Sequence, residues 1–183
     1  MEPLPLSRLV EPAAEHAASY RGFVREFVER KEALIPFTLG FPSDPFAAFL
    51  EKLAACARGE GIPEGFVPHS TFWLVHEDEV VGVSNIRHRL TEALRRNGGN
   101  IGYSVRPSAR GRGFARQLLR LTLERARGLG LAEAWLTCAK TNAASVRTML
   151  ANGAVLVSEE FIESRGEVVQ RYRISLSGKD RLS

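Results

Sequence analysis

The chain has 183 residues, of which 44% are hydrophobic and 25% charged, and these are ordinary values for a protein that buries a core in water. The formal net charge is +4, but the basic residues are scattered along the chain, which argues against nucleic acid as a partner. No apolar run approaches the roughly 20 residues of a membrane span, and the first residues do not resemble a signal peptide, so we expect a cytoplasmic protein without a membrane partner.

The first part of the chain predicts a short strand and two helices. Leu6 to Val10 has the composition of a strand, and His16 to Ala33 has the apolar spacing of a helix. The segment from Leu34 to Pro45 is apolar but interrupted by prolines and a glycine, so it predicts a loop. Phe46 to Ala57 predicts a second helix that begins after a proline.

The middle of the chain predicts strands. Thr71 to His76 and Val80 to Ile86 are rich in aromatic and β-branched residues and flank a polar turn, which indicates a hairpin. Arg87 to Gly99 is a polar connection of a length that favours a functional loop. Asn100 to Val105 predicts a further strand, which ends before a proline.

The last part alternates helices and strands. Phe114 to Leu129 has apolar residues at spacings of three and four, the pattern of an amphipathic helix. Glu133 to Cys138 predicts a strand, and Asn142 to Asn152 predicts a helix with an asparagine as its N-cap. Val155 to Ile162 and Val168 to Ile174 predict a final pair of strands.

The order of these elements indicates a mixed α/β fold. The part from Asn100 to Cys138 reads as strand, helix and strand, a crossover that joins parallel strands. The length favours one domain, which we expect over residues 1–176, followed by a polar tail over 177–183. The two cysteines, Cys56 and Cys138, are far apart in apolar contexts, so we expect reduced, buried thiols and no metal site.

The segment from Arg110 to Ala115 (Arg-Gly-Arg-Gly-Phe-Ala) carries the clearest chemical signal. It joins a strand end to a helix start, where unpaired backbone N–H groups and the helix dipole favour an anion. Gly111 and Gly113 leave room for a phosphate, and two arginines add positive charge. A dinucleotide-binding pattern would need glycine in place of Arg116, and the lysine of a nucleotide-triphosphate loop is absent.

This segment resembles the R/Q-x-x-G-x-G/A signature of the GNAT N-acetyltransferases, with Arg110, Gly113 and Ala115 at its fixed positions. The family's second cofactor region is similar to Asn142-Ala-Ala-Ser145, which opens a predicted helix. The resemblance covers about Ser70 to Tyr172. A narrower resemblance, to a bacterial group of predicted acetyltransferases, appears in Asn85-Ile-Arg-His88 and Ile101-Gly-Tyr-Ser-Val-Arg-Pro107.

The resemblance implies a twisted, mostly antiparallel sheet with a central pair of parallel strands that are splayed around the cofactor, flanked by helices. The pantetheine arm of acetyl-CoA would lie in the split, and the pyrophosphate would lie on the amides of the glycine turn. The implied cofactor-binding residues are Val105, Arg110, Gly111, Arg112, Gly113, Phe114, Ala115, Asn142 and Ser145.

The implied reaction is transfer of the acetyl group of acetyl-CoA to a primary amine, by direct attack in a ternary complex. The catalytic candidates are His88, Asn100 and Tyr103, of which only the histidine titrates near neutral pH. Related proteins often have histidine in place of Asn100, and many carry a tyrosine as general acid where this chain has Met149.

Two other functions stay open. One is a non-catalytic sensor of acyl-CoA that has kept the cofactor cleft, and the other is a phosphate-binding regulatory module without specificity for CoA. The acceptor, a small-molecule or peptide amine, is not identified by the sequence. The oligomeric state is also left open, with a homodimer among the alternatives.

Overall fold

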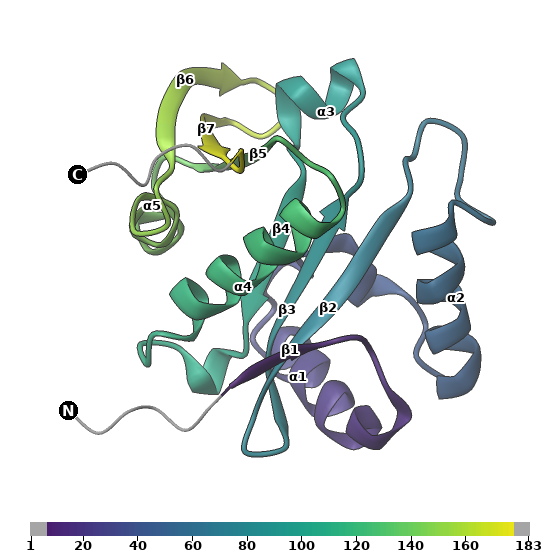
Figure 1. Ribbon diagram of the computed structural model, residues 1–183. Coiled ribbons are helices and arrows are strands. Elements are labelled where there is room, and N and C mark those ends of the chain that lie inside the picture. Colours follow the sequence, from purple (N-terminus) through teal and green to yellow (C-terminus); the bar gives the residue numbers. More distant parts are fainter. Residues whose placement is uncertain (1–6, 178–183) are drawn as a thin grey trace.

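The computed structural model describes residues 7–177 and arranges them as two antiparallel sheets flanked by helices (Figure 1). The strands are β1 (Arg8–Val10), β2 (His69–His76), β3 (Glu79–Arg87), β4 (Ile101–Val105), β5 (Glu133–Ala139), β6 (Val155–Ile162) and β7 (Glu167–Ser175). The α-helices are α1 (Ala17–Glu29), α2 (Phe46–Arg58), α3 (Glu92–Asn97), α4 (Phe114–Gly128) and α5 (Ala143–Leu150). The short 3₁₀ helices are η1 (Ala14–His16), η2 (Phe37–Gly40) and η3 (Pro107–Ala109).

The first sheet has the strand order β1-β2-β3-β4 and is covered on both faces. Because side chains alternate between the faces of a strand, β2 sends Phe72 and Leu74 into the core shared with α4, and Trp73 into the core shared with α1 and α2. Both cores are closely packed, and Tyr20 of α1 stacks on the Trp73 ring at 4.6 Å. The two faces of this sheet therefore present different side chains to different layers of helices.

The second sheet has the order β5-β7-β6, and α5 joins β5 to β6 (Figure 1). In the described residues, β4 and β5 share no ladder of hydrogen bonds and meet only at an isolated bridge between Gly99 and Leu136. Gly99 has a φ of +93°, and its backbone lies so close to the Trp135 carbonyl that a Cβ would not fit. The start of β4 therefore meets the middle of β5, and the two strands separate beyond that point.

Most of the predicted elements are present, and two of the differences bear on the site. The first helix ends at Glu29 rather than Ala33, because Lys31 takes a φ of +55° and the Glu32 amide returns to the Phe27 carbonyl at 3.0 Å. The predicted loop after β3 contains the helix α3, whose N-cap Thr91 accepts a hydrogen bond from the Leu94 amide. The strand β1 begins at Arg8, and its predicted start at Leu6 lies outside the described residues, as do residues 178–183 of the tail.

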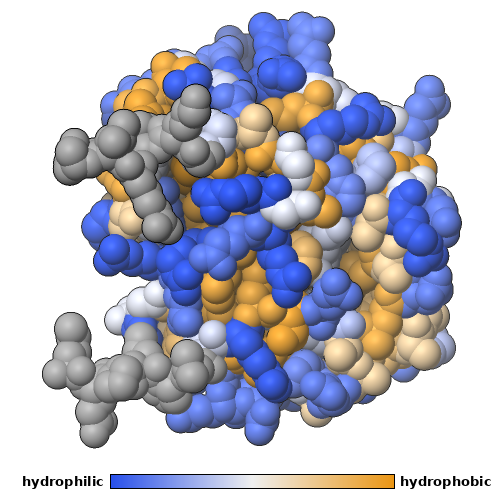
Figure 2. Space-filling model, viewed as in Figure 1, coloured by the Kyte–Doolittle hydropathy of each residue, from blue (hydrophilic) through white to orange (hydrophobic). Residues whose placement is uncertain are grey.

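The surface in Figure 2 carries hydrophilic side chains between smaller apolar areas. Among residues 7–177, no helix has the length and apolar character that a membrane span requires.

Candidate functional site

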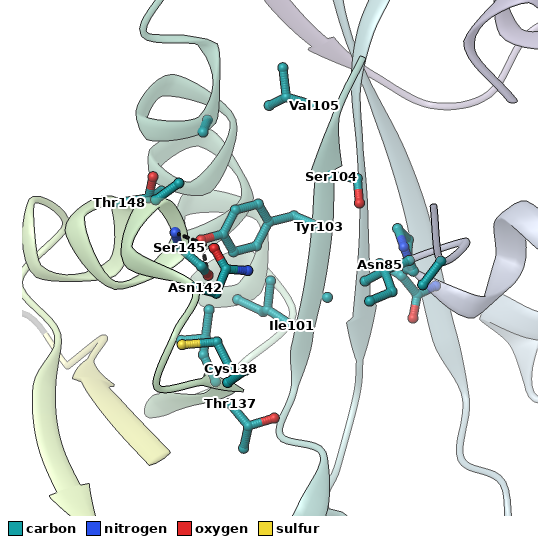
Figure 3. Close-up of a pocket in the computed structure, with 18 of the residues that line it drawn as sticks. Asn85, Ile101, Tyr103, Ser104, Val105, Thr137, Cys138, Asn142, Ser145 and Thr148 are labelled. Atoms are coloured by element: carbon teal, nitrogen blue, oxygen red, sulfur yellow. Dashed lines mark hydrogen bonds between the residues drawn. The ribbon is translucent and has the colours of Figure 1, made fainter. Parts of the chain in front are cut away.

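A cleft of about 1100 Å³ opens where β4 and β5 separate. One wall is β4 from Ile101 to Val105, and the other wall consists of Leu136 to Ala139 with the start of α5 (Figure 3). One end reaches the turn before α4, and the other end reaches η2 and the end of β3. The split that opens this cleft is thus the one that the resemblance implied.

The turn before α4 presents a row of free backbone N–H groups. Gly111 and Gly113 have φ values of +78° and +85°, and a Cβ on either would meet no atom within 4 Å, so the turn is open toward the cleft. Within the described residues, the amides of Gly111, Arg112 and Gly113 donate to no acceptor. The next amides belong to the first turn of α4 and have no partner inside the helix. The turn therefore offers an anion site at a helix N-terminus, reinforced by the helix dipole.

The two arginines of the turn differ in their surroundings. Arg110 donates to both carboxylate oxygens of Glu32, at 3.0 and 2.6 Å, and its Nε donates to the Val105 carbonyl at 3.3 Å. These bonds hold the turn against the end of α1, and they also lower the pKa of Glu32. Arg112 is exposed, with its guanidinium 5.0 Å from the centre of the Phe114 ring. Arg112 is thus freer than Arg110 to contact a bound anion.

A pair of hydroxyl groups bridges the two walls of the cleft. The Tyr103 side chain points from β4 toward α5, and its hydroxyl lies 3.1 Å from the Ser145 hydroxyl (Figure 3). Burial raises the pKa of Tyr103 to about 12, so the phenol stays protonated at neutral pH. The Asn142 side chain caps α5 by accepting from the Ser145 amide at 3.1 Å. This cap fixes the serine opposite the tyrosine, and all three residues line the cleft.

The opposite face of the first sheet carries a buried polar cluster on β2 and β3. Asn85 lines the cleft, and its side-chain amide donates to His69 Nδ1 at 2.9 Å and to Thr71 Oγ1 at 3.1 Å. Burial, helped by the charge of Arg87, lowers the pKa of His69 to about 4. The histidine is therefore neutral near pH 7, and its Nδ1 accepts the hydrogen bond that orients Asn85.

The depressed pKa of His69 makes stability depend on pH. The unfolded chain takes up a proton near the ordinary pKa of about 6.5, whereas the folded chain resists it down to about 4. The free energy of unfolding should therefore fall as the pH drops from 6.5 to 4, and this contribution should stop growing below the folded pKa. Chemical denaturation of the wild type and His69→Gln across this range measures it. Equal falls in both proteins would contradict the assignment.

The other catalytic candidates lie away from the cleft lining. Asn100 is buried at the meeting point of the two sheets, where its amide donates to the Arg87 carbonyl at 3.2 Å and its oxygen accepts from the Trp135 amide at 3.1 Å. His88 Nε2 lies 2.8 Å from the Ser70 hydroxyl. Neither is among the residues that line the cleft. Tyr103 alone of the three candidates lines it, and the bonds of Asn100 join the sheets.

Met149 occupies the position where many related proteins carry a tyrosine, and its side chain is completely buried in the core beside α4. Hydroxyl groups line the cleft from other residues, and those of Tyr103 and Ser145 lie opposite each other across it. Cys138 also faces the cleft, and burial raises the pKa of its thiol. Across residues 7–177, histidine, cysteine and acidic side chains form no group of three or more that would hold a metal ion.

A family model for the acetyltransferase (GNAT) family matches residues 30–153, more than half of the chain. The chain belongs to the GNAT acetyltransferase family. The match includes the glycine turn, both walls of the cleft and the start of α5. Acetyl-CoA, expected from the sequence, is the co-substrate of this family. No protein with a curated description matches the chain significantly.

Solved structures share the GNAT fold. A putative acetyltransferase, yncA, from Salmonella typhimurium with acetyl-CoA is 16% identical, covers 97% of this chain and 98% of its own, and has a TM-score of 0.63. RimL, a ribosomal L7/L12 α-N-protein acetyltransferase in complex with coenzyme A, is 16% identical over the same shares, with a TM-score of 0.66. A dodecameric spermidine N-acetyltransferase from Vibrio cholerae is 17% identical, covers 93% of this chain and 94% of its own, and has a TM-score of 0.61.

These comparisons confirm the predicted family and the predicted fold. The identities are low, so the structural similarity bears on the fold and leaves the acceptor open. The roles of individual residues, the division at residue 176, the cytoplasmic location and the homodimer stay predictions.

Proposed function

We propose that the protein transfers the acetyl group of acetyl-CoA to a primary amine of a small molecule or a peptide. The observation that carries the proposal is the cleft between β4 and β5, which joins an open anion site to a pair of hydroxyl groups. An acyl-CoA has the same sequence of parts: a pyrophosphate, a long arm and a thioester. The cleft at about 1100 Å³ is at the large end of ligand sites, in keeping with a long co-substrate.

The glycine turn would hold the pyrophosphate. The amides from Gly111 to Ala115 supply fixed donors, and Arg112 adds a mobile charge. Arg110 would act mainly through Glu32 and the Val105 carbonyl, by keeping the turn in place. The arm would run along β4 past the Val105 backbone, with Asn142 and Ser145 on the other wall.

In the reaction, the nitrogen of a neutral amine forms a bond to the thioester carbon, and the carbon–sulfur bond breaks. The departing thiolate takes a proton, for which Tyr103 is the best donor because it is protonated and faces the cleft. The tyrosine would then regain a proton from water through the Ser145 hydroxyl, which takes up one proton as it passes one on. The proton of the amine would leave to water. Asn85 lies on β3 opposite Gly102 of β4, on the sheet face away from Tyr103, where an acceptor would approach.

This route differs from the sequence-based hypothesis of His88 as the proton relay. Because the His88 ring binds Ser70 outside the cleft lining, we expect His88→Gln to change kcat by less than about twofold, far below a general-base effect of about 10². The pH profile of kcat/KM should also keep its shape. A loss of about 10²-fold in kcat, with loss of an inflection near the histidine pKa, would restore the histidine as the base.

The proposed function is tested by incubating the protein with acetyl-CoA and a panel of amines while free thiol is measured. Release of thiol that depends on an amine, with the acetylated amine detected by mass spectrometry, is the expected result. A sensor would bind acetyl-CoA and release no thiol. A general phosphate-binding module would bind ADP as tightly as CoA, which a paired titration would show.

A further inference from the structure

Arg87, the last residue of β3, stands at the acceptor end of the cleft without an acidic partner. Its guanidinium lines both the cleft and a second, smaller cavity of about 260 Å³. Nη1 donates to the Gly99 carbonyl at 3.0 Å, and in the described residues the side chain makes no other hydrogen bond and no ion pair. The other nitrogen atoms of the guanidinium have no hydrogen-bond partner in the described residues. None of them is completely buried, so they are accessible to solvent.

Two other arginines in this part of the molecule, unlike Arg87, have carboxylate partners. Arg106 donates to Glu26 at 2.6 Å, and Arg110 pairs with Glu32. Arginine stays protonated in proteins, so a partly buried guanidinium without an anion loses hydration, and the Gly99 carbonyl and the Phe37 ring, 5.6 Å away, replace only part of it. Burial lowers the pKa of Arg87, which reflects that loss. An anionic group of a ligand would restore the missing partner, in a planar and bidentate geometry.

The smaller cavity beside Arg87 is apolar. Its lining includes Phe37 of η2, Phe66, Val67 and Leu94. Phe37 packs edge-on against Phe66 at 5.8 Å, and yet Phe66 is 48% exposed. A cavity of about 150 Å³ is large enough for benzene, so this one accommodates a phenyl ring or a branched alkyl group. An apolar group bound there would cover the exposed aromatic ring.

Asn85 lies two residues before Arg87 on β3 and therefore faces the same side of the sheet. Its side-chain nitrogen is held by His69 and Thr71, which leaves its oxygen as an acceptor. Asn85 is 1% exposed, but that oxygen is absent from the buried atoms without a partner, so a small part of it reaches the surface of the cleft that Asn85 lines. The strand β3 thus presents the Asn85 oxygen, which can accept a hydrogen bond from an amine. Two residues further along the same face, it presents the Arg87 guanidinium, which can bind an anion.

From these contacts we propose that the acceptor is an amino carboxylate with an apolar side chain, the chemistry of a hydrophobic amino acid. Its carboxylate binds Arg87, its amine donates to the Asn85 oxygen, and its side chain enters the cavity beside Phe37 and Phe66. The assignment rests on the proposed acetyl transfer, and it names the class of acceptor. It also separates this acceptor from a polyamine, which needs free acidic partners.

The charges of the cleft support that separation. Glu32 and Glu167 are the acidic residues among its lining, and because Glu32 is already paired with Arg110, Glu167 is left as a single carboxylate for the several ammonium groups of a polyamine. Arginines outnumber them, with Arg87 and Arg165 at the acceptor end. A second ammonium group would therefore meet repulsion beside Arg87, whereas a carboxylate would meet attraction.

The test compares phenylalanine with phenylalanine amide, phenethylamine, spermidine and a short peptide that has an N-terminal phenylalanine. We expect phenylalanine to have the highest kcat/KM, and removal of the carboxylate to raise KM by about 10-fold or more, as for a lost hydrogen bond to a charged group. Arg87→Gln should remove this preference. Arg89→Gln, which changes the same charge at an exposed neighbour, should keep it. The peptide arm distinguishes a free amino acid from a chain terminus.

A binding measurement keeps the proposal independent of turnover. Calorimetry of the CoA complex with N-acetylphenylalanine and with N-acetylphenethylamine should show tighter binding of the carboxylate in the wild type and in Arg89→Gln, and equal binding in Arg87→Gln. Transfer to amines without a preference for the carboxylate overturns this inference and leaves the proposed function in place. Binding of the carboxylate with no thiol release from any amine contradicts the proposed function and leaves the carboxylate site in place. Equal binding of both ligands by the wild type rejects the carboxylate site.

Discussion

Gly113→Glu is expected to weaken the binding of CoA by about 100-fold or more. The residue caps α4 with a φ of +85°, and a side chain there would project into open space in front of the free amides. A carboxylate about 4 Å from a phosphate charge costs about 4 kcal/mol at the effective dielectric near a protein surface. Calorimetric titration with CoA measures the change.

The matched control is Gly130→Glu. Gly130 follows the other end of α4, has a φ of +84° and also faces open space. Both variants should lose about 1–2 kcal/mol of stability from a side chain in the left-handed region. Only the variant at Gly113 should lose CoA binding. Undiminished affinity in Gly113→Glu, in a folded protein, would rule out the turn as the pyrophosphate site.

Tyr103→Phe is expected to lower kcat by about 10²-fold, the smaller end of general-acid effects, because a thiolate is a tolerable leaving group. The affinity for CoA should change little, since the ring that lines the cleft is retained. Because burial raises the pKa of Tyr103 to about 12, the wild-type rate should show no loss from this tyrosine until well above the ordinary pKa of about 10. Steady-state kinetics across the pH range measure both effects.

Tyr172→Phe is the control for the loss of a buried hydroxyl. Tyr172 is also buried, and its hydroxyl donates to Gln170 at 2.8 Å rather than to a residue of the cleft wall. Its replacement should lower stability and leave kcat nearly unchanged. If both variants lost activity equally, the hydroxyl of Tyr103 would have only a structural role. A full rate in Tyr103→Phe would show that the thiolate leaves without this donor.

The sequence did not predict the helix α3 or the early end of α1, and each has a physical cause. α3 spans six residues and begins at Thr91, a good N-cap, but its segment lacks an apolar face of helical spacing. The first helix stops early because its end closes on the Phe27 carbonyl, which turns Glu32 toward Arg110. The partner of that carboxylate lies far along the chain, so local periodicity does not contain the signal.

The role of Asn100 illustrates the same limit. A polar residue at the start of a predicted strand is a reasonable candidate for catalysis. The structure uses both ends of its amide to join β3 with β5, through the carbonyl of Arg87 and the amide of Trp135. A buried amide needs partners, and here the backbones of two sheets supply them. Arg87 can be read in the sequence, but the absence of a carboxylate beside it in the described residues depends on the tertiary positions of the neighbouring acidic residues.

The sequence by itself determined the parts that depend on neighbours along the chain: the strand-turn-helix with its two glycines, the cap at Asn142 and the order of the elements. Left-handed backbone angles and helix caps are local requirements, so the residues that satisfy them can be recognised from the sequence alone. The tertiary structure decided which side chains face the cleft. Tyr103 meets Ser145 across the cleft because the two sheets separate beyond the bridge at Gly99, and this contact joins residues whose separation in sequence carries no periodic signal.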